Sequence, residues 1–485
     1  MLTATGLFLT LPFITRRVGD PDYWWHELTG QWIAQHGAFA RHELYTYTVS
    51  GAPWTDHEYL SQLLYYGLNR IGGLATISIF FAAVVWAGFW LLLARVRLSA
   101  HSPWIAGAGL VLGAAAGFAV WGPRPQMFDF LFVSLELFWI DRFLRGRGRA
   151  LYALPAVVLL WANLHGGFVF SFFFLGLAIA AVLVRWLWEG RRDHAQLIAA
   201  RQLGLVAVAS AVASLATPWG PSLFIYVWRT QFSSQLAGFV TEWQSPDFHM
   251  ANMLAFEAML LLVVIGFAWK RPRLLDVFFV IGSAVLALHA LLFIPIFVAV
   301  ATPVVIWQWS DVWEQLRDRW RATRIARRPY WLTEGLGMLL ALALIGSVAF
   351  SAYTLQGQAA STRANYPVAA ADWLASHSNV GTRVFNEYSW GGYLAYRFYP
   401  EPTRRVFIYG ESELMGDTLL AKYSDIDQLH GDWSRLLDQF GVDYVVFPVD
   451  TRLVSALDAS PNWHRAYSDS VAVIFTRASG AGPAQ

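Results

Sequence analysis

The stretch Asp20-Pro21-Asp22-Tyr23-Trp24-Trp25-His26-Glu27 follows the first apolar segment of the chain, Met1 to Ile14. Its two acids lie one residue apart, directly before a pair of tryptophans, where the apolar segment gives way to a polar loop. Amphipathic aromatic rings settle at the boundary between lipid and water, so this position indicates a membrane surface. The pattern favours a reaction centre facing that surface, and an enzyme acting on a lipid-linked substrate becomes the hypothesis to test.

The composition of the 485 residues is that of a membrane protein with many crossings. The chain is 56% hydrophobic and only 14% charged, which is outside the range of ordinary soluble domains. Its 25 Trp, 19 Tyr and 34 Phe fit many helix ends at the two interfaces. The absence of cysteine excludes disulfides, thiolate zinc sites and a cysteine nucleophile. A net charge of +2 is too small to indicate nucleic acid as a partner.

Apolar runs between charged breaks predict a polytopic α-helical protein with about eleven transmembrane helices. The expected spans lie near 1–14, 71–94, 104–121, 126–140, 151–163, 167–188, 203–217, 251–269, 275–289, 291–309 and 333–353. Alternating their sides places 19 basic residues in the loops and helix ends of one face and 6 on the other. The positive-inside rule predicts that the first face is cytoplasmic. The loop with Asp20 and Asp22, and everything after residue 354, is then extracytoplasmic.

The sequence predicts two domains. Residues 1–353 form the transmembrane domain, and its first outer loop, 15–70, carries amphipathic helices that lie in the membrane interface. Residues 354–485 form a small extracytoplasmic α/β domain with a disordered tail. In that domain, strand-like runs at 383–385, 405–409, 444–447 and 472–475 alternate with helix-like runs at 368–376, 418–428 and 433–440.

Asp20 and Asp22 are the leading candidates for catalysis. Two carboxylates in an Asp-x-Asp arrangement can hold a divalent cation, or one of them can act as a general base. A structural alternative is equally open for one of the two, because aspartate is a favoured N-cap and the residues from Tyr23 to Ala34 have helical spacing. A capping role for both aspartates is less favoured.

His57 and Glu58 close the same outer loop. Together with Asp20 they could complete a metal site, or they could orient an acceptor. Adjacent residues on a helix point about 100 degrees apart, so both can be ligands only where the backbone is irregular. The alternative is that Asp56 or Glu58 is simply an acid at the start of a helix.

Further polar groups gather at the outer ends of the expected spans. Arg124 lies between two prolines and could bind a phosphate in bidentate fashion, or contact lipid headgroups. Asp129 lies close enough to the outer end to join such a site. No Gly-rich phosphate loop, Ser/His/Asp signature or Walker pattern is present, so no nucleotide cofactor is expected.

A third set of residues has the chemistry to bind a sugar or an acceptor. Sugars bind through hydroxyl hydrogen bonds and aromatic stacking, which suits Glu242, Trp243 and Trp25. Asn163 and His165 precede two glycines, which permit close approach of a ligand to the backbone. Each has an ordinary alternative, namely loop packing for Glu242 and Trp243 and hydration or a carbonyl contact for the histidine.

These motifs resemble the membrane-embedded glycosyltransferases of the GT-C fold that use polyprenyl-phosphate sugars, and especially a bacterial branch of them. The resemblance covers most of the chain and rests on the segments 20–26, 51–60, 124–126, 161–167, 242–246 and 388–394. The sequence departs from the usual pattern in its short first span. It also has Glu411 directly after Gly410, where the pattern would have an arginine.

The resemblance implies a multi-pass protein of the bacterial inner membrane that transfers a sugar from a polyprenyl phosphate. The acceptor is an extracytoplasmic glycan, lipid or protein, and the transfer inverts the anomeric centre. Asp22 or Asp20 is then the general base or orients the acceptor, and Arg124 binds the donor phosphate. His57, Glu58 and His165 lie around a metal or the acceptor. A divalent metal ion at Asp20, His57 and Glu58 would be the only cofactor, and membrane lipids are further partners.

A second class of function stays open. The chain could be a transporter or flippase, or a structural subunit of a membrane complex. A transporter is expected to carry polar or broken helices near the bilayer midplane and often repeated halves, and neither is evident in the sequence.

Overall fold

The computed structural model describes residues 2–189, 193–231, 233, 240–322, 330–401 and 403–478, with backbone only for 320–322 and 330–336. The chain divides into two compact units. The first, here called the helical unit, comprises Met1–Arg17, Ala75–Gly220 and Thr241–Gln356. The second, the α/β unit, comprises Val18–Leu74, Pro221–Val240 and Gly357–Gln485. The tail that we expected to be disordered, from residue 480, lies outside the described residues.

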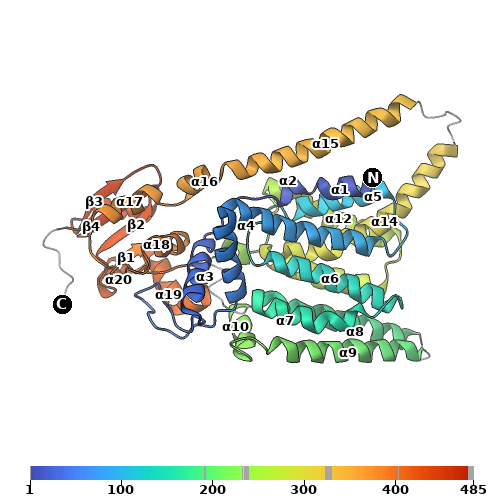
Figure 1. Cartoon of the computed structure of the whole chain (residues 1–485), viewed down its shortest axis with the longest axis horizontal. Coiled ribbons are helices and arrows are strands. Elements are labelled where there is room, and N and C mark those ends of the chain that lie inside the picture. The colour runs from blue at the N-terminus through green and yellow to red at the C-terminus, as the bar shows by residue number, and fades with distance from the viewer. Residues whose placement is uncertain are drawn as a thin grey trace. The chain divides into compact units, whose positions relative to one another are not determined.

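Helices make up the helical unit. Figure 1 shows α8 and α9 running side by side, and α13 packs on α14. Its elements are α1 (Leu2–Phe8), α2 (Leu11–Ile14), the second part of α4 (Tyr59–Val96), α5 (Pro103–Ala116), α6 (Met127–Leu144), η1 (Ala150–Ala153), α7 (Leu154–Leu164), η2 (Gly166–Phe168), α8 (Val169–Trp188), α9 (His194–Ser214), η3 (Thr241–Trp243), η4 (Ala251–Met253), α12 (Leu254–Trp269), α13 (Leu274–His289), η5 (Leu291–Phe293), α14 (Ile294–Ala322) and α15 (Tyr330–Gln356).

The predicted polytopic helical architecture is confirmed. Within the described residues, 6 helices are long and apolar enough to cross a membrane, and they lie at Tyr59–Val96, Gly166–Trp188, His194–Ser214, Ala251–Trp269, Leu291–Arg319 and Gly337–Gln356. Shorter apolar helices occupy Leu2–Ile14, Pro103–Ala116, Ala150–Leu164 and Leu274–His289. The remaining expected span, 126–140, falls on α6, which carries Asp129, Glu136 and Asp141.

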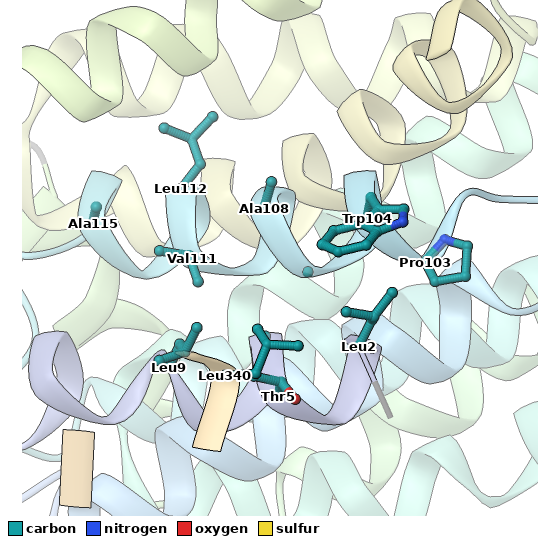
Figure 2. A pocket seen from close by; sticks show the side chains of 12 residues that line it. Leu2, Thr5, Leu9, Pro103, Trp104, Ala108, Val111, Leu112, Ala115 and Leu340 are labelled. Carbon is teal, nitrogen blue, oxygen red and sulfur yellow. The ribbon is translucent and has the colours of Figure 1, made fainter. Parts of the chain in front are cut away.

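The first apolar segment packs closely on α5. A Cβ atom added to Gly6 would lie 2.4 Å from the Cα atom of Gly107, which is the close backbone approach that small residues permit between membrane helices. Beside this crossing lies an apolar groove of about 520 Å³, into which Leu2, Val111 and Leu340 contribute side chains (Figure 2). The short first segment is therefore held against α5 by close backbone packing at Gly6 and Gly107.

Helix α4 has a break at Gly72–Gly73. Gly73 has φ 68° and ψ −160°, a conformation that side-chain-bearing residues rarely adopt. The boundary between the two compact units falls directly after this break, at Leu74.

The α/β unit contains a four-stranded sheet with the order β1-β2-β4-β3 (Figure 1). Its strands are β1 (Val384–Asn386), β2 (Tyr444–Pro448), β3 (Trp463–Ser468) and β4 (Ala472–Arg477). Strands β1 and β2 are parallel, and the other two pairings are antiparallel. The helical elements of this unit are α3 (Tyr23–His36), the start of α4, α10 (Ser222–Gln231), α16 (Gln358–Asn365), α17 (Val368–Ser376), η6 (Tyr388–Trp390), α18 (Gly391–Phe398), α19 (Ser412–Asp427), α20 (Trp433–Gln439) and α21 (Arg452–Asp458).

The expected strand at 405–409 is wrong in detail. Its residues make only isolated bridges, between Val406 and Thr46 and between Arg405 and Arg383. A residue of the first loop, Thr46, therefore pairs with the segment where a longer strand was expected.

Helix α3 differs from the interfacial helix that its spacing predicted. Residues Tyr23 to Gly30 are all buried, whichever face they lie on. The ring of Trp24 packs 4.9 Å from Tyr393 and 5.4 Å from Tyr366. Protein side chains from the C-terminal part of the chain therefore cover Trp24.

Candidate functional site

Asp22 precedes helix α3 and makes no side-chain capping hydrogen bond there. Its Oδ1 atom instead accepts a hydrogen bond of 3.0 Å from the indole Nε1 of Trp25. The neighbouring Asp20 has a local role, because its Oδ1 atom accepts from the backbone nitrogen of Asp22 at 3.0 Å. A side chain therefore holds Oδ1 of Asp22, and Oδ1 of Asp20 binds a backbone amide.

The backbone of Gly410 lies close against the carboxylate of Asp22. A Cβ atom added to this glycine would lie 1.7 Å from Oδ1 of Asp22 and 3.2 Å from Nε1 of Trp25. Cβ atoms essentially never approach other atoms below 3.0 Å, so only glycine leaves the carboxylate where it is. Trp25 itself is buried, with its ring 3.8 Å from His26 and 5.6 Å from Tyr409. This packing favours a supporting role for Trp25 over the sugar contact that we expected.

Glu58 links two histidines within the α/β unit. One of its carboxylate oxygens lies 3.0 Å from Nε2 of His26, and the other lies 3.0 Å from Nε2 of His57. His57 also stacks on Tyr226 of α10, with ring centroids 4.2 Å apart. The start of α4 at Tyr59 leaves His57 and Glu58 just outside the helix, where adjacent side chains are able to converge.

More acids surround this histidine pair. Glu411 is buried and accepts a 3.0 Å hydrogen bond from the hydroxyl of Tyr226. Burial raises the pKa of Glu411 well above its ordinary value, and the nearby carboxylate of Glu58 raises it further. Asp56 is buried as well, and burial raises its pKa to about 8, although the hydrogen bond from Gln62 opposes the shift.

The raised pKa of Asp56 predicts that the α/β unit loses stability as the pH rises from about 4 to about 8. The folded state binds the proton more tightly than the unfolded chain, so its stabilising effect is complete below the unfolded pKa and is lost on passing the folded one. Each pH unit in this window costs at most about 1.4 kcal/mol. We expect the melting temperature of Asp56→Asn to exceed that of the wild type by a margin that grows between pH 5 and pH 8 and is constant above pH 9. A margin independent of pH would contradict the assignment.

In the helical unit, Arg124 is already paired with an acid. Its Nη1 atom donates to both carboxylate oxygens of Glu242 at 2.7 Å. The Arg124 side chain is only 12% exposed, whereas that of Glu242 is 41% exposed. The predicted phosphate-binding residue and a predicted sugar-binding residue therefore contact each other.

Asp129 and His165 form a second pair in the helical unit. Oδ1 of Asp129 lies 2.8 Å from Nδ1 of His165 and accepts a 2.8 Å hydrogen bond from the indole of Trp161. The same Nδ1 atom lies 3.1 Å from the backbone nitrogen of Gly167, so these contacts together hold the orientation of the imidazole ring. Gly167 completes the arrangement, since a Cβ atom there would lie 2.1 Å from Oδ1 of Asp129.

Two of the expected ligand-binding residues have structural contacts. The amide nitrogen of Asn163 donates to the backbone carbonyls of Leu159 and Ala216, at 2.7 Å and 3.3 Å. Trp243 packs with its ring centroid 6.2 Å from that of Phe293.

The candidate residues divide between the two units. Asp20, Asp22, Trp25, His57 and Glu58 lie in the α/β unit. The helical unit contains the others, namely Arg124, Asn163, His165, Glu242 and Trp243.

Imidazole and carboxylate groups suit a divalent metal. His57 and Glu58 place potential ligand atoms within 4.8 Å of each other. Nitrogen from histidine and oxygen from a carboxylate are common ligands of zinc and other divalent ions. The donor set therefore fits a metal at His57 and Glu58, whereas the carboxylate of Asp20 is engaged by the backbone nitrogen of Asp22.

Several residues of this region carry no signal that we recognised in the sequence. His26 lies within the segment 20–26 but had no role assigned there, and Tyr226 lacks a motif. They join the site through contacts with Glu58, His57 and Glu411. In the sequence, Glu411 stood out only because it follows Gly410 where the family pattern would have an arginine. Its burial beside Tyr226, 185 positions away in sequence, was not accessible without the fold.

Comparison with solved structures identifies the architecture. The archaeal oligosaccharyltransferase AglB from Archaeoglobus fulgidus, in complex with an inhibitory peptide and a dolichol-phosphate, matches with a TM-score of 0.58 and 12% identity, over 99% of this chain and 74% of that one. ArnT from Cupriavidus metallidurans in the apo state matches with a TM-score of 0.52 and 14% identity, over 99% of this chain and 97% of that one. The chain has the GT-C fold. No family model and no curated protein matches the sequence, so the GT-C fold is recognised here through structure.

A second structure of the Archaeoglobus fulgidus oligosaccharyltransferase, tethered with an acceptor peptide, has a TM-score of 0.53 at 13% identity, over 98% of this chain and 74% of that one. Together with the apolar helices, these matches make the chain a multi-pass membrane protein of the GT-C fold.

Proposed function

We propose that the chain is a glycosyltransferase that moves a sugar from a polyprenyl-phosphate donor to an extracytoplasmic acceptor. The GT-C fold supports this class of reaction, and one structure of that fold contains a dolichol-phosphate and a peptide. The observation that carries the proposal is Asp22, whose carboxylate makes no capping bond and is held between Trp25 and Gly410. A carboxylate fixed in this way suits a general base better than a helix cap.

Asp22 would remove the proton from the attacking group of the acceptor as that atom bonds to the anomeric carbon. The bond between the anomeric carbon and the phosphate oxygen breaks in the same step, and the polyprenyl phosphate leaves with the electron pair. Attack from the side opposite the phosphate inverts the anomeric centre. Asp20 would help to position Asp22 through its bond to the backbone nitrogen of that residue.

His57 and Glu58 would hold the divalent metal ion of this reaction. Bound there, the ion would supply positive charge to the leaving phosphate. His26 lies against Glu58 and would fix the orientation of that carboxylate. Residues in the helical unit, namely Asn163, His165 and Trp243, would contact the acceptor or the sugar, with His165 oriented by Asp129.

Arg124 would bind the donor phosphate, and Glu242 would compete with it. Arg124→Ala is expected to raise the apparent KM for the donor about tenfold or more, because a charge-assisted bond to phosphate is lost. Glu242→Gln is the matched variant, since it removes the competing charge and is expected to lower the same constant. Steady-state kinetics with increasing donor would measure both. Unchanged donor KM in Arg124→Ala would remove the phosphate role.

The cellular setting is part of the proposal. We place the chain in a bacterial inner membrane, with residues 354–485 on the extracytoplasmic side of the transmembrane domain formed by residues 1–353. A cysteine introduced at the exposed Ser376 should then react with a membrane-impermeant maleimide in intact spheroplasts.

The test of the function is release of polyprenyl phosphate. Purified protein in lipid nanodiscs would be incubated with polyprenyl-phosphate sugars and with membrane extracts as the acceptor source. Mass spectrometry of surface glycans from a deletion strain would identify the acceptor. Donor consumption that depends on Asp22 supports the proposal, whereas wild-type glycans in the deletion strain would oppose it.

A further inference from the structure

One end of the helical unit contains more arginine donors than its carboxylates satisfy. Asp141, near the end of α6, accepts from Nε of Arg95 at 2.6 Å through one oxygen and from Nη1 of Arg273 at 2.8 Å through the other. Nε of Arg145 is 3.9 Å from the nearer oxygen, which is too far for a hydrogen bond. Both oxygens of Asp141 thus serve other arginines.

The remaining donors of these arginines are buried. Arg95 is 0% exposed, and its Nη1 and Nη2 atoms have no hydrogen-bond partner among the described residues. Arg145 donates through Nη1 to the carbonyl of Leu98 at 2.9 Å, but its buried Nε atom has no partner in the same part of the chain. All three guanidinium groups lie around Trp307, at 5.5 Å, 5.8 Å and 4.6 Å from its ring for Arg95, Arg145 and Arg273. Buried donors of this kind are costly unless an acceptor is supplied.

A cavity of about 730 Å³ lies beside this cluster. Arg145, Arg185 and Arg273 line it, and the ends of α6, α8, α9 and α13 meet there. Part of the wall is apolar and consists of Leu144, Ala181, Val182, Leu274 and Leu275. The cavity therefore combines cationic donors with a surface suited to hydrocarbon.

The acids that line the cavity, Asp141 and Asp193, and two acids that pair with its arginines are already engaged. Asp193 accepts from the backbone nitrogen of Ala195 at 2.9 Å as the N-cap of α9, and Asp141 is shared as described above. Glu189 pairs with Arg185 at 2.9 Å, although the side chain of Arg185 is 65% exposed. Asp276 takes two further bonds from Arg273. Among the arginines that line the cavity, Arg145 therefore has a buried donor, its Nε atom, that makes no hydrogen bond to these acids.

We infer that this cavity binds the phosphate of an anionic phospholipid, with an acyl chain along the apolar wall. Arginine is well suited to phosphate recognition, and basic pockets between transmembrane helices are typical sites for anionic headgroups. Inorganic phosphate offers the same oxygens but makes no use of the leucine-rich wall. The basic residues at this end are those that predict the cytoplasmic side, so the lipid belongs to the cytoplasmic leaflet.

Native mass spectrometry of the full-length protein in detergent would test the site with three probes: phosphatidylglycerol, phosphatidylcholine and inorganic phosphate. We expect phosphatidylglycerol to bind at least about fivefold more tightly than phosphatidylcholine, and inorganic phosphate not to displace it at equal concentration. Equal binding of the two lipids would overturn the preference for an anionic ligand. Displacement by inorganic phosphate would overturn the lipid assignment.

The structure provides a closely matched control. Arg147 also donates to the carbonyl of Leu98, at 3.1 Å, but it is exposed and does not line the cavity. Arg145→Gln is expected to weaken phosphatidylglycerol binding about fivefold, while Arg147→Gln, with the same change of charge, leaves it unchanged. Arg185→Gln serves if Arg145→Gln does not fold, because Arg185 is largely exposed, and it should weaken binding in the same direction. Equal effects of the Arg145 and Arg147 variants would reject the site.

Discussion

Asp22→Asn is expected to lower the rate of sugar transfer by about 10²-fold to 10⁴-fold, which is the usual contribution of a general base. The amide is nearly the same size as the carboxylate and can still accept the 3.0 Å hydrogen bond from the indole of Trp25. It cannot take a proton from the acceptor. Turnover of purified protein, measured as release of polyprenyl phosphate, gives the rate, and donor binding measured separately should be nearly unchanged.

Asp20→Asn distinguishes a chemical role from a structural one. Its amide oxygen can replace the carboxylate oxygen that accepts from the backbone nitrogen of Asp22, so we expect a much smaller loss of rate. If the two variants lose activity equally, Asp20 shares the chemistry. If Asp22→Asn keeps wild-type turnover while remaining folded by thermal unfolding, Asp22 is not the base.

Gly410→Ala is expected to reduce turnover by about 10²-fold although residue 410 carries no chemistry. The new methyl group would lie 1.7 Å from Oδ1 of Asp22, so the carboxylate must move, and a displacement of about 1 Å in a catalytic group has effects of this size. The backbone at Gly410 is not in the left-handed region, so the alanine itself introduces no backbone strain. The rate of transfer and the melting temperature should both be measured.

Two comparisons sharpen this test. Gly67→Ala, in the same unit, places its methyl group where no atom lies within 4 Å, and it should leave the rate unchanged. The double variant Gly410→Ala with Asp22→Asn should be no slower than Asp22→Asn alone. The first change displaces the carboxylate that the second change removes, so both act on the same group. A further loss in the double variant would mean that Gly410 acts on a different part of the protein.

Hydropathy was enough to predict the helical architecture. Apolar segments that cross a membrane must satisfy their backbone as helices, so each expected span falls on a helix. The close packing of the short first span, where Gly6 and Gly107 bring two backbones together, came from the structure.

The position of α3 could not be predicted in the same way. Its spacing gave one apolar face, but the partners that bury Trp24 are Tyr366 and Tyr393, more than 300 positions later in the chain. An aromatic residue at a lipid boundary and one in a protein interior have the same local pattern. Long-range contacts decide between them, and a single sequence does not contain those contacts.

The candidate residues were recognised by type, and their pairings came from the structure. Asp129 and His165 were each noticeable as polar groups near the outer ends of helices, but only the fold brings Oδ1 and Nδ1 to 2.8 Å. Arg124 and Glu242 were assigned to different parts of the substrate, yet they bind each other. Periodicity fixes which face a residue occupies, whereas pairing depends on how helices far apart in sequence are packed.

The contact between Arg124 and Glu242 has a consequence for selectivity. A bilayer presents phosphate groups at very high local concentration, and an unopposed guanidinium at its surface would be filled by ordinary lipids. Nη1 of Arg124 donates to both carboxylate oxygens of Glu242, so an incoming phosphate must displace this internal anion. If Arg124 binds the donor phosphate as proposed, only a ligand that gains further contacts through its sugar and its isoprenoid chain would do so, and the acid would then separate the rare donor from the abundant lipid background.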